Sequence, residues 1–344
     1  KAAGLFYLRG KTQIETNEVV AGDIAAFAKL EETQTGDTIS SKQDPIVYKR
    51  IKYPQAALSF AIEPQTKNDE DKIGHALMKI AEEDPTFSFE RNPETKQLII
   101  SGLGNVQLQI VLDKLVNAYG VKTNIIPLRI PYRETIKGKS DVQGRHKKQS
   151  GGAGQFGDVF IKFEPIEEGF EFDEEVFGGA VPKNYFPAVE KGLQESMEKG
   201  VLAGYPVTGI KATLYDGSYH PVDSNEMAFK IAASIAFKKG VEAAQPILLE
   251  PVMKIVVNIP ESYMGDVMGD INKKRGRILG MNPQEDGSQE IVAEAPYSEL
   301  VEYAIDLRSM TQGRGAFTRE FVRYEEVPAM YAEKIIEESK KEEK

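Results

Sequence analysis

The chain has 344 residues, of which 41% are hydrophobic and 28% charged, and its 53 acidic and 43 basic side chains give a net charge of −10 at pH 7. This length predicts roughly two to four domains. The absence of cysteine excludes disulfides and thiolate metal sites, and the three histidines are too scattered for a metal-ligand spacing. The acidic balance argues against a uniformly basic nucleic-acid binder, although local basic patches remain compatible with it.

The sequence contains no apolar run long enough to span a membrane and no signal-peptide pattern at its start. Together with the lack of cysteine, this predicts a cytoplasmic protein in a reducing compartment without a membrane partner.

Residues 1–43 contain short strand-like pieces, such as 4–8 and 23–30, separated by Gly and Asp turns. They suit the end of a small β-barrel, and the abrupt start without Met predicts a piece of a longer protein. The tripeptide 10–12 reads Gly-Lys-Thr, but the preceding Gly is misplaced for a phosphate loop and no helical stripe follows.

Residues 44–126 show a βαββαβ order, which is the ferredoxin-like plan. Apolar side chains recur at helical spacing in two segments, and four other short segments read as strands. The expected elements are a strand at 57–62, a helix at 69–83, a hairpin of 86–90 and 97–101, a helix at 106–119 and a strand at 121–126.

The same order returns in 247–344, which predicts a second ferredoxin-like domain followed by a C-terminal helix. Its expected elements are a strand at 252–259, a helix at 262–273, a hairpin of 277–281 and 290–295, a helix at 297–308 and a strand at 317–324. The two domains flank a different middle domain, 127–246, so the fold class is multidomain α+β.

A glycine-rich stretch at 143–157 dominates the middle domain. It places four glycines in seven positions directly after Arg145, Lys147 and Lys148, and 158–165 then alternates as a strand. Glycines at this density can present bare N–H groups to a phosphate, and the cations would attract a polyanion. The alternative is an ordinary hairpin with solvated charges.

The rest of the middle domain predicts a helix at 186–199, a strand at 207–215 and a loop that carries His220. Asp223 is expected to cap the next helix, with Glu226 completing a capping box and the helix running to 239. A histidine between a strand end and a helix start can contact a phosphate or base, although an incidental surface residue is the simpler interpretation.

Four groups of motifs resemble bacterial elongation factor G. Residues 149–157 and 214–229 resemble its fourth domain, and Thr-Gly-Asp-Thr at 35–38 fits the end of its second, barrel domain. The motifs that resemble the third domain lie at 62–67, 82–87 and 100–104, and those that resemble the fifth lie at 250–253, 263–267, 275–281 and 306–317.

The resemblance implies the C-terminal portion of a translational GTPase, with GTP and Mg²⁺ held in an N-terminal GTPase domain that precedes residue 1. The middle domain would then be an elongated, ribosomal-protein-S5-like arm that enters the decoding centre, contacts tRNA and mRNA, and promotes translocation. This work is positional, so no catalytic residue and no metal ligand is assigned in this chain. The resemblance places six residues at the arm tip: Ser150, Gly151, Gly152, Gly154, Gln155 and His220.

Basic side chains supply the other candidate ribosome contacts. In the C-terminal domain, the resemblance favours contact with large-subunit ribosomal RNA, where solvated turns are the alternative. The candidates there are Lys273, Lys274, Arg275, Arg277 and Arg314, in addition to Arg145, Lys147 and Lys148 in the arm. Phe156 and Tyr219 could stack on bases, although burial beneath the loop is the simpler interpretation of Phe156.

Two departures from the family pattern suggest a divergent paralogue. Ala153 stands where the tip loop usually has a basic residue, and Asn-Val-Gln-Leu-Gln at 105–109 replaces a run with two carboxylates and a histidine. Ribosome recycling, ribosomal protection and a stand-alone RNA-binding module therefore remain alternatives to translocation.

Overall fold

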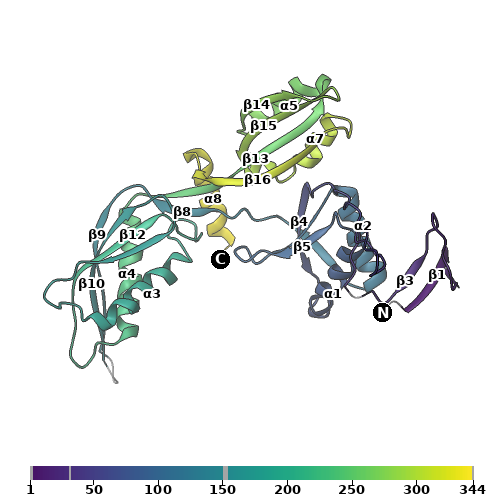
Figure 1. Cartoon of the computed structure of the whole chain (residues 1–344). Helices are drawn as coiled ribbons and strands as arrows, with labels where there is room; N and C mark the ends of the chain where they lie inside the picture. Colours follow the sequence, from purple (N-terminus) through teal and green to yellow (C-terminus); the bar gives the residue numbers. More distant parts are fainter. Residues whose placement is uncertain (1–2, 31, 150–153, 343–344) are drawn as a thin grey trace. The chain divides into compact units, whose positions relative to one another are not determined.

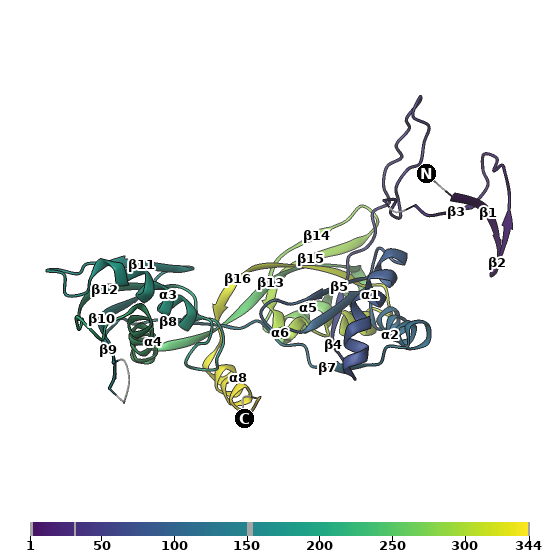
Figure 2. The same cartoon turned by 90° about the horizontal axis from the view of Figure 1, so that it is seen from below.

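The computed structural model describes residues 3–30, 32–149 and 154–342 (Figures 1 and 2). The chain forms two compact units, the first built mainly from residues before 127 and the second mainly from residues after it. Ser150, Gly151, Gly152 and Ala153 lie outside the described residues. No helix in the described part of the chain combines the length and the apolar character needed to cross a membrane.

The N-terminal segment forms a small antiparallel sheet in the order β2-β1-β3. Its strands are β1 (Ala3–Arg9), β2 (Thr12–Glu15) and β3 (Ala26–Ala28). Residues 12–15, which overlap the rejected phosphate-loop tripeptide, are thus a strand and not a helix. The expected strand at 23–30 is limited to three residues, and the described residues between β3 and residue 58 form no helix or strand.

The next segment has the order βαββαβ. The elements are β4 (Leu58–Pro64), α1 (Lys67–Glu83), β5 (Ser88–Arg91), β6 (Leu98–Gly102), α2 (Asn105–Tyr119) and β7 (Thr123–Ile126). The sheet order is β5-β6-β4-β7. Helix α1 buries Ile73, Leu77 and Ile80, whose spacing in sequence indicated the helix.

The C-terminal segment repeats this strand order as β14-β15-β13-β16, and every pair in it is antiparallel. The elements are β13 (Pro246–Pro260), α5 (Met264–Lys273), β14 (Arg277–Pro283), β15 (Ser288–Pro296), α6 (Tyr297–Leu300), α7 (Tyr303–Met310), β16 (Ala316–Glu326) and α8 (Ala329–Glu342). The single helix expected at 297–308 is divided into α6 and α7. Strand β13 is longer than expected because its first four residues pair with β8 (Arg133–Ile136).

The middle segment has a sheet of order β11-β12-β10-β9, in which only β11 and β12 are parallel to each other. The elements are β9 (Ser140–Lys148), β10 (Gln155–Pro165), β11 (Phe170–Glu174), α3 (Phe186–Met197), β12 (Ile210–Ser218) and α4 (Glu226–Ala243). Helices α3 and α4 cover one face of the sheet (Figure 2).

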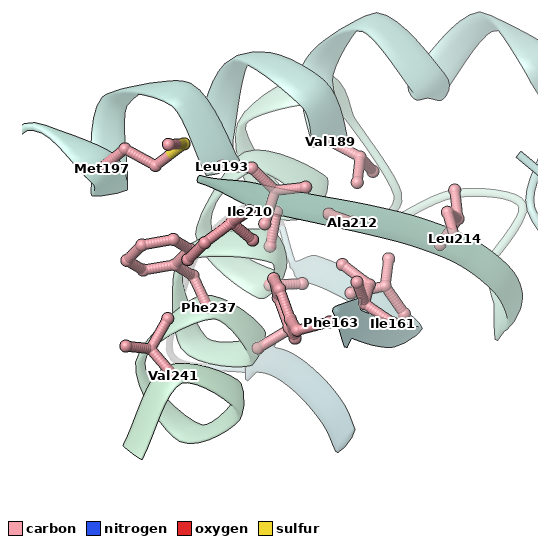
Figure 3. Close-up of a cluster of buried hydrophobic side chains, with 14 of the residues drawn as sticks. Ile161, Phe163, Val189, Leu193, Met197, Ile210, Ala212, Leu214, Phe237 and Val241 are labelled. Carbon is pink, nitrogen blue, oxygen red and sulfur yellow. The ribbon is translucent and has the colours of Figure 1, made fainter. Parts of the chain in front are cut away.

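The core of this segment lies between the sheet and the two helices. Figure 3 shows Val189 and Leu193 of α3 beside Ile210 and Leu214 of β12, with Phe163 of β10 below them. All five side chains are fully buried. This core holds the β9–β10 hairpin and the loop after β12 on one rigid support.

The expected cap of α4 is wrong. Asn225, and not Asp223, is the N-cap residue, because the Asn225 side chain accepts a hydrogen bond from the Ala228 amide. Asp223 lies two residues earlier, where its carbonyl accepts a hydrogen bond from the Phe156 amide. Asp223 thus belongs to the loop that contacts the glycine-rich hairpin, and the helix begins after Asn225.

Candidate nucleic-acid interface

The β9–β10 hairpin packs on α4 through two glycines, one on each strand. A Cβ at Gly144 would lie 2.1 Å from the Ala232 carbonyl oxygen, and one at Gly157 would lie 2.5 Å from the Ala228 carbonyl oxygen. Any side chain at either position would push the hairpin away from the helix. These two glycines are therefore required for close packing beneath the candidate site.

The loop that follows β12 is joined to the start of β10 by hydrogen bonds on both sides of Phe156. The Phe156 amide donates to the Asp223 carbonyl at 2.9 Å, and the Ser224 hydroxyl donates to the Phe156 carbonyl at 2.8 Å. A Cβ at Gly154 would lie 2.5 Å from the Asp223 carboxyl carbon, so the two segments touch there also. The structure thus brings Gly154 and Gln155 together with the loop that carries His220.

The two ring nitrogens of His220 have different roles: Nδ1 holds the loop together, and Nε2 faces its surface. Its Nδ1 atom accepts hydrogen bonds from the Val222 amide at 3.3 Å and the Asp223 amide at 3.2 Å. An accepting Nδ1 leaves the ring hydrogen on Nε2 in the neutral imidazole. The Asp223 carboxylate, 3.5 Å from Nδ1, then receives no hydrogen from that nitrogen. With 52% of the side chain exposed, the Nε2–H is a donor available to a ligand.

Residues on the two strands surround this loop. The side-chain oxygen of Gln155 lies 2.8 Å from His146 Nε2 and accepts a hydrogen bond when that nitrogen carries the ring hydrogen. The Arg145 guanidinium lies over the Phe156 ring, 5.4 Å from its centroid, and the same ring lies 6.5 Å from His220. Lys147 and Lys148 lie at the end of β9, where Lys148 is exposed. Cationic, aromatic and imidazole groups therefore gather at this end of the hairpin.

In the described part of the chain, some of the basic residues predicted as contacts in the C-terminal segment form ion pairs with carboxylates, and others do not. Lys274 donates to Asp306 Oδ2 at 2.7 Å; burial alone would lower its pKa, but the carboxylate raises it overall. Arg277 is exposed and bonds to Glu294 at 3.0 Å. Lys273 and Arg314 are exposed, and within the described residues neither has an ion-pair partner. These last two are the most available cations of the predicted set.

Arg275 is the most enclosed of the predicted contacts. Its Nη1 and Nη2 atoms donate to the two carboxylate oxygens of Glu250 at 2.6 and 2.9 Å, and its Nε donates to Glu299 at 3.0 Å. Its guanidinium carbon also lies 4.4 Å from the Tyr331 ring centroid. Burial would lower the pKa of Arg275, but these carboxylates raise it. In this structure the side chain joins β13, α6 and α8 and does not offer a free fork to phosphate.

The departure at 105–109 has a structural role. Gln107 donates to Asp84 Oδ2 at 2.6 Å and to Thr86 at 2.7 Å, and it accepts from the Leu103 amide at 2.6 Å. The side-chain amide therefore ties the first turn of α2 to the loop after α1. Within the described residues no cluster of three or more metal-ligating side chains occurs.

Sequence reasoning missed Ser224 and Asn225, which fix the position of the His220 loop. The signal was available in part, because Asp-Ser-Asn at 223–225 offers three side chains that favour caps and turns. Which of the three faces the hairpin is decided only by the folded structure.

Comparison with known proteins assigns these segments to the domains of one translation factor. Residues 53–127 match the family model "Elongation Factor G, domain III", residues 128–245 match "Elongation factor G, domain IV", and residues 247–335 match "Elongation factor G C-terminus". None of the three matched models is a nucleotide-binding domain. The chain belongs to the elongation factor G family.

A solved structure supports the same arrangement of elements. A crystal structure of a protein from Thermus thermophilus aligns with a TM-score of 0.82 and 40% sequence identity over 98% of this chain. The match covers 51% of the Thermus protein, so this chain spans about half its length.

Proposed function

We propose that this chain is the ribosome-binding C-terminal portion of an elongation factor G-like GTPase that promotes tRNA–mRNA translocation. The observation that carries the proposal is the junction of the β9–β10 hairpin with the His220 loop, which is held by the hydrogen bonds of Phe156 to Asp223 and Ser224. The junction presents a donor on His220 Nε2 and the cations of β9 at one end of a packed sheet. Such a surface suits contact with RNA, without any bond being made or broken.

The proposal includes a domain plan. Residues 1–43 would be the end of barrel domain II, 44–126 domain III, 127–246 the ribosomal-protein-S5-like arm, or domain IV, and 247–344 domain V with its helix. The shared order of strands in the sheets of 44–126 and 247–344 supports a ferredoxin-like fold for both.

Within this plan, the tip would consist of Ser150, Gly151, Gly152, Gly154, Gln155 and His220, and it would meet tRNA and mRNA at the decoding centre. Lys273 and Arg314 would contact large-subunit ribosomal RNA, because they are the exposed cations of the predicted set that lack an ion-pair partner within the described residues. GTP and Mg²⁺ would be bound by the protein's own N-terminal GTPase domain, and the protein would work in the cytoplasm.

Sedimentation with ribosomes tests this function. The chain should pellet with ribosomes at low salt, and its apparent affinity should fall steeply as salt rises because Lys and Arg contacts to phosphate release counterions. In the full-length protein a non-hydrolysable GTP analogue should strengthen the association. Failure to pellet at low salt, with or without the analogue, would contradict the proposal.

A further inference from the structure

The sheet of the middle segment has a second face that α3 and α4 do not cover. Side chains of β10 alternate between the two faces, so Val159, Ile161 and Phe163 enter the core. Phe156, Phe160 and Lys162 point the other way, where the two rings are half-buried and the lysine is exposed. We call this surface the outer face, and near the tip it includes Arg145, Lys147, Phe156, Phe160, Lys162 and Tyr215, together with Asp141 and Asp158.

Cations and aromatic rings alternate on the outer face. Arg145 lies over Phe156 at 5.4 Å, and the Lys162 ammonium lies over Tyr215 at 4.6 Å. The Tyr215 ring in turn lies 6.2 Å from Phe160. The ring beneath each cation restricts the cation's side chain before any ligand binds. Less conformational entropy is then lost when the cation binds an anion.

The cations of the outer face near the tip lack direct ion-pair partners within the described residues. Arg145, Lys147 and Lys162 take part in no ion pair within the described residues. Farther from the tip the same sheet has paired lysines, since Lys139 bonds to Glu164 at 2.5 Å and Lys211 bonds to Asp173 at 3.2 Å. In the described part of this sheet, these three cations therefore form no direct ion pair, although Asp158 stands opposite Arg145 and Asp141 opposite Lys162 in the strand pairing.

The carboxylates of this part of the sheet are already engaged. Asp158 is buried and accepts hydrogen bonds from Gln143 at 2.7 Å and Ser218 at 2.8 Å. Asp141 accepts a hydrogen bond from the Tyr215 hydroxyl at 2.8 Å. Neither carboxylate is in an ion pair with Arg145 or Lys162 in the described structure.

We propose that the outer face binds the sugar–phosphate backbone of RNA and extends the RNA contact of the tip along the hairpin to Lys162. This inference rests on the proposed function and adds Lys162, which sequence reasoning did not select. At about 3.3 Å per residue, the face from Phe156 to Lys162 spans roughly 20 Å, enough for several phosphates. RNA is favoured over an acidic protein segment because the unpaired cations lie on the same two strands that end at the tip.

The first test compares Lys162→Gln with Lys211→Gln in the whole chain. Both changes remove one lysine from the same side of the sheet, but Lys211 is paired with Asp173, whereas Lys162 lies over Tyr215 and has no ion-pair partner within the described residues. Lys162→Gln should weaken binding to ribosomes several-fold and lower the slope of log K against log salt by about 0.7 to 0.9, the loss expected for one phosphate contact. Lys211→Gln should leave the slope unchanged, and thermal unfolding of both variants checks that the fold is intact.

The second test uses the absence of cysteine in the chain. A Lys162→Cys variant carrying a photo-activated cross-linker should attach to RNA when it is bound to ribosomes, and attachment to a ribosomal protein alone would overturn the inference. If the parent chain pellets with ribosomes but Lys162→Gln has the parental slope, the outer face is excluded while the proposed function stands. If the parent chain does not pellet at all, both are overturned.

Discussion

At the scale of single residues, the pairing of a side chain decides its role more than its charge does. Arg275 and Arg277 are two positions apart in a basic run, yet the Arg275 side chain is 18% exposed and the Arg277 side chain 69%. Arg275 holds Glu250, which is only 4% exposed in its side chain, whereas the exposed Arg277 bonds to Glu294, which Arg323 also holds. The Arg275–Glu250 pair joins elements of the fold. In the Arg277–Glu294 pair, Arg277 is exposed and could leave the carboxylate to bind a ligand.

Arg275→Ala should therefore destabilise the chain strongly. Removing the guanidinium leaves the Glu250 carboxylate buried without a partner, which costs about 3–5 kcal/mol. Arg277→Ala is the matched control and should cost at most about 1 kcal/mol, as exposed ion pairs do. Urea unfolding of the three proteins measures both values, and equal stability of the two variants would contradict the role given to Arg275.

The sequence could not distinguish these arginines, because carboxylates that lie 25 positions before and 24 positions after Arg275 complete its site. Periodicity within short segments, by contrast, predicted the order of helices and strands in 44–126 and 247–344 correctly. The cap of α4 shows the same limit: Asp223 and Asn225 are both residue types that favour N-caps, and the sequence alone does not say that the helix begins after Asn225.

The tip itself was predictable in part. The density of glycine indicated a hairpin, but the described structure shows that Gly157 serves close packing on α4. Lys162 was not selected because a single lysine in an alternating strand gives no sign of the ring on which it rests.

At the scale of elements, buried carboxylates fix the ends of helices. Asp69, in the first turn of α1, accepts hydrogen bonds from the Thr66 hydroxyl at 2.6 Å and from the Lys122 amide at 3.2 Å. The hydroxyl of Thr66, followed by the Lys122 amide, lowers the pKa of Asp69 below its usual value of 3.8. One side chain thus joins the start of α1 to the residue before β7.

Asp69 should make this element sensitive to acid. A carboxyl whose pKa is lowered in the folded state stabilises that state fully above its ordinary pKa, and the contribution is lost as the pH falls through the lower folded value. Asp69→Asn should therefore be less stable than the parent at neutral pH, and the gap should narrow as the pH falls below about 4. Chemical unfolding of both proteins over this range measures the gap, and a gap that widens in acid would contradict the assignment.

At the scale of the whole molecule, the net charge is negative and the positive charge is confined to local patches. The net charge of −10 coexists with unpaired cations on β9 and β10 and at Lys273 and Arg314. Strand β13 pairs with β8 at its start and with β15 and β16 farther along, so one continuous strand links the middle segment to the C-terminal segment. This link suits the proposed function, in which the chain positions two RNA-binding surfaces.

The chain alone should neither bind nor hydrolyse GTP. The tripeptide at 10–12 lacks the spacing of a phosphate loop and runs into β2, whereas a phosphate loop requires a helix there. Calorimetric titration with a GTP analogue should show no saturable heat, and binding at micromolar concentration would contradict this assignment.

The most direct test of the account is single-round translocation by the full-length protein with His220 replaced. His220→Ala removes two long hydrogen bonds at an exposed site and should cost about 1 kcal/mol or less in stability. His220→Asn, whose side-chain oxygen can accept the same amides, controls for the loop geometry. Both variants lack the Nε2–H donor, so both should slow tRNA movement while ribosome binding stays close to that of the parent. Parental translocation rates in both variants would contradict the claim that this tip acts on the tRNA–mRNA complex.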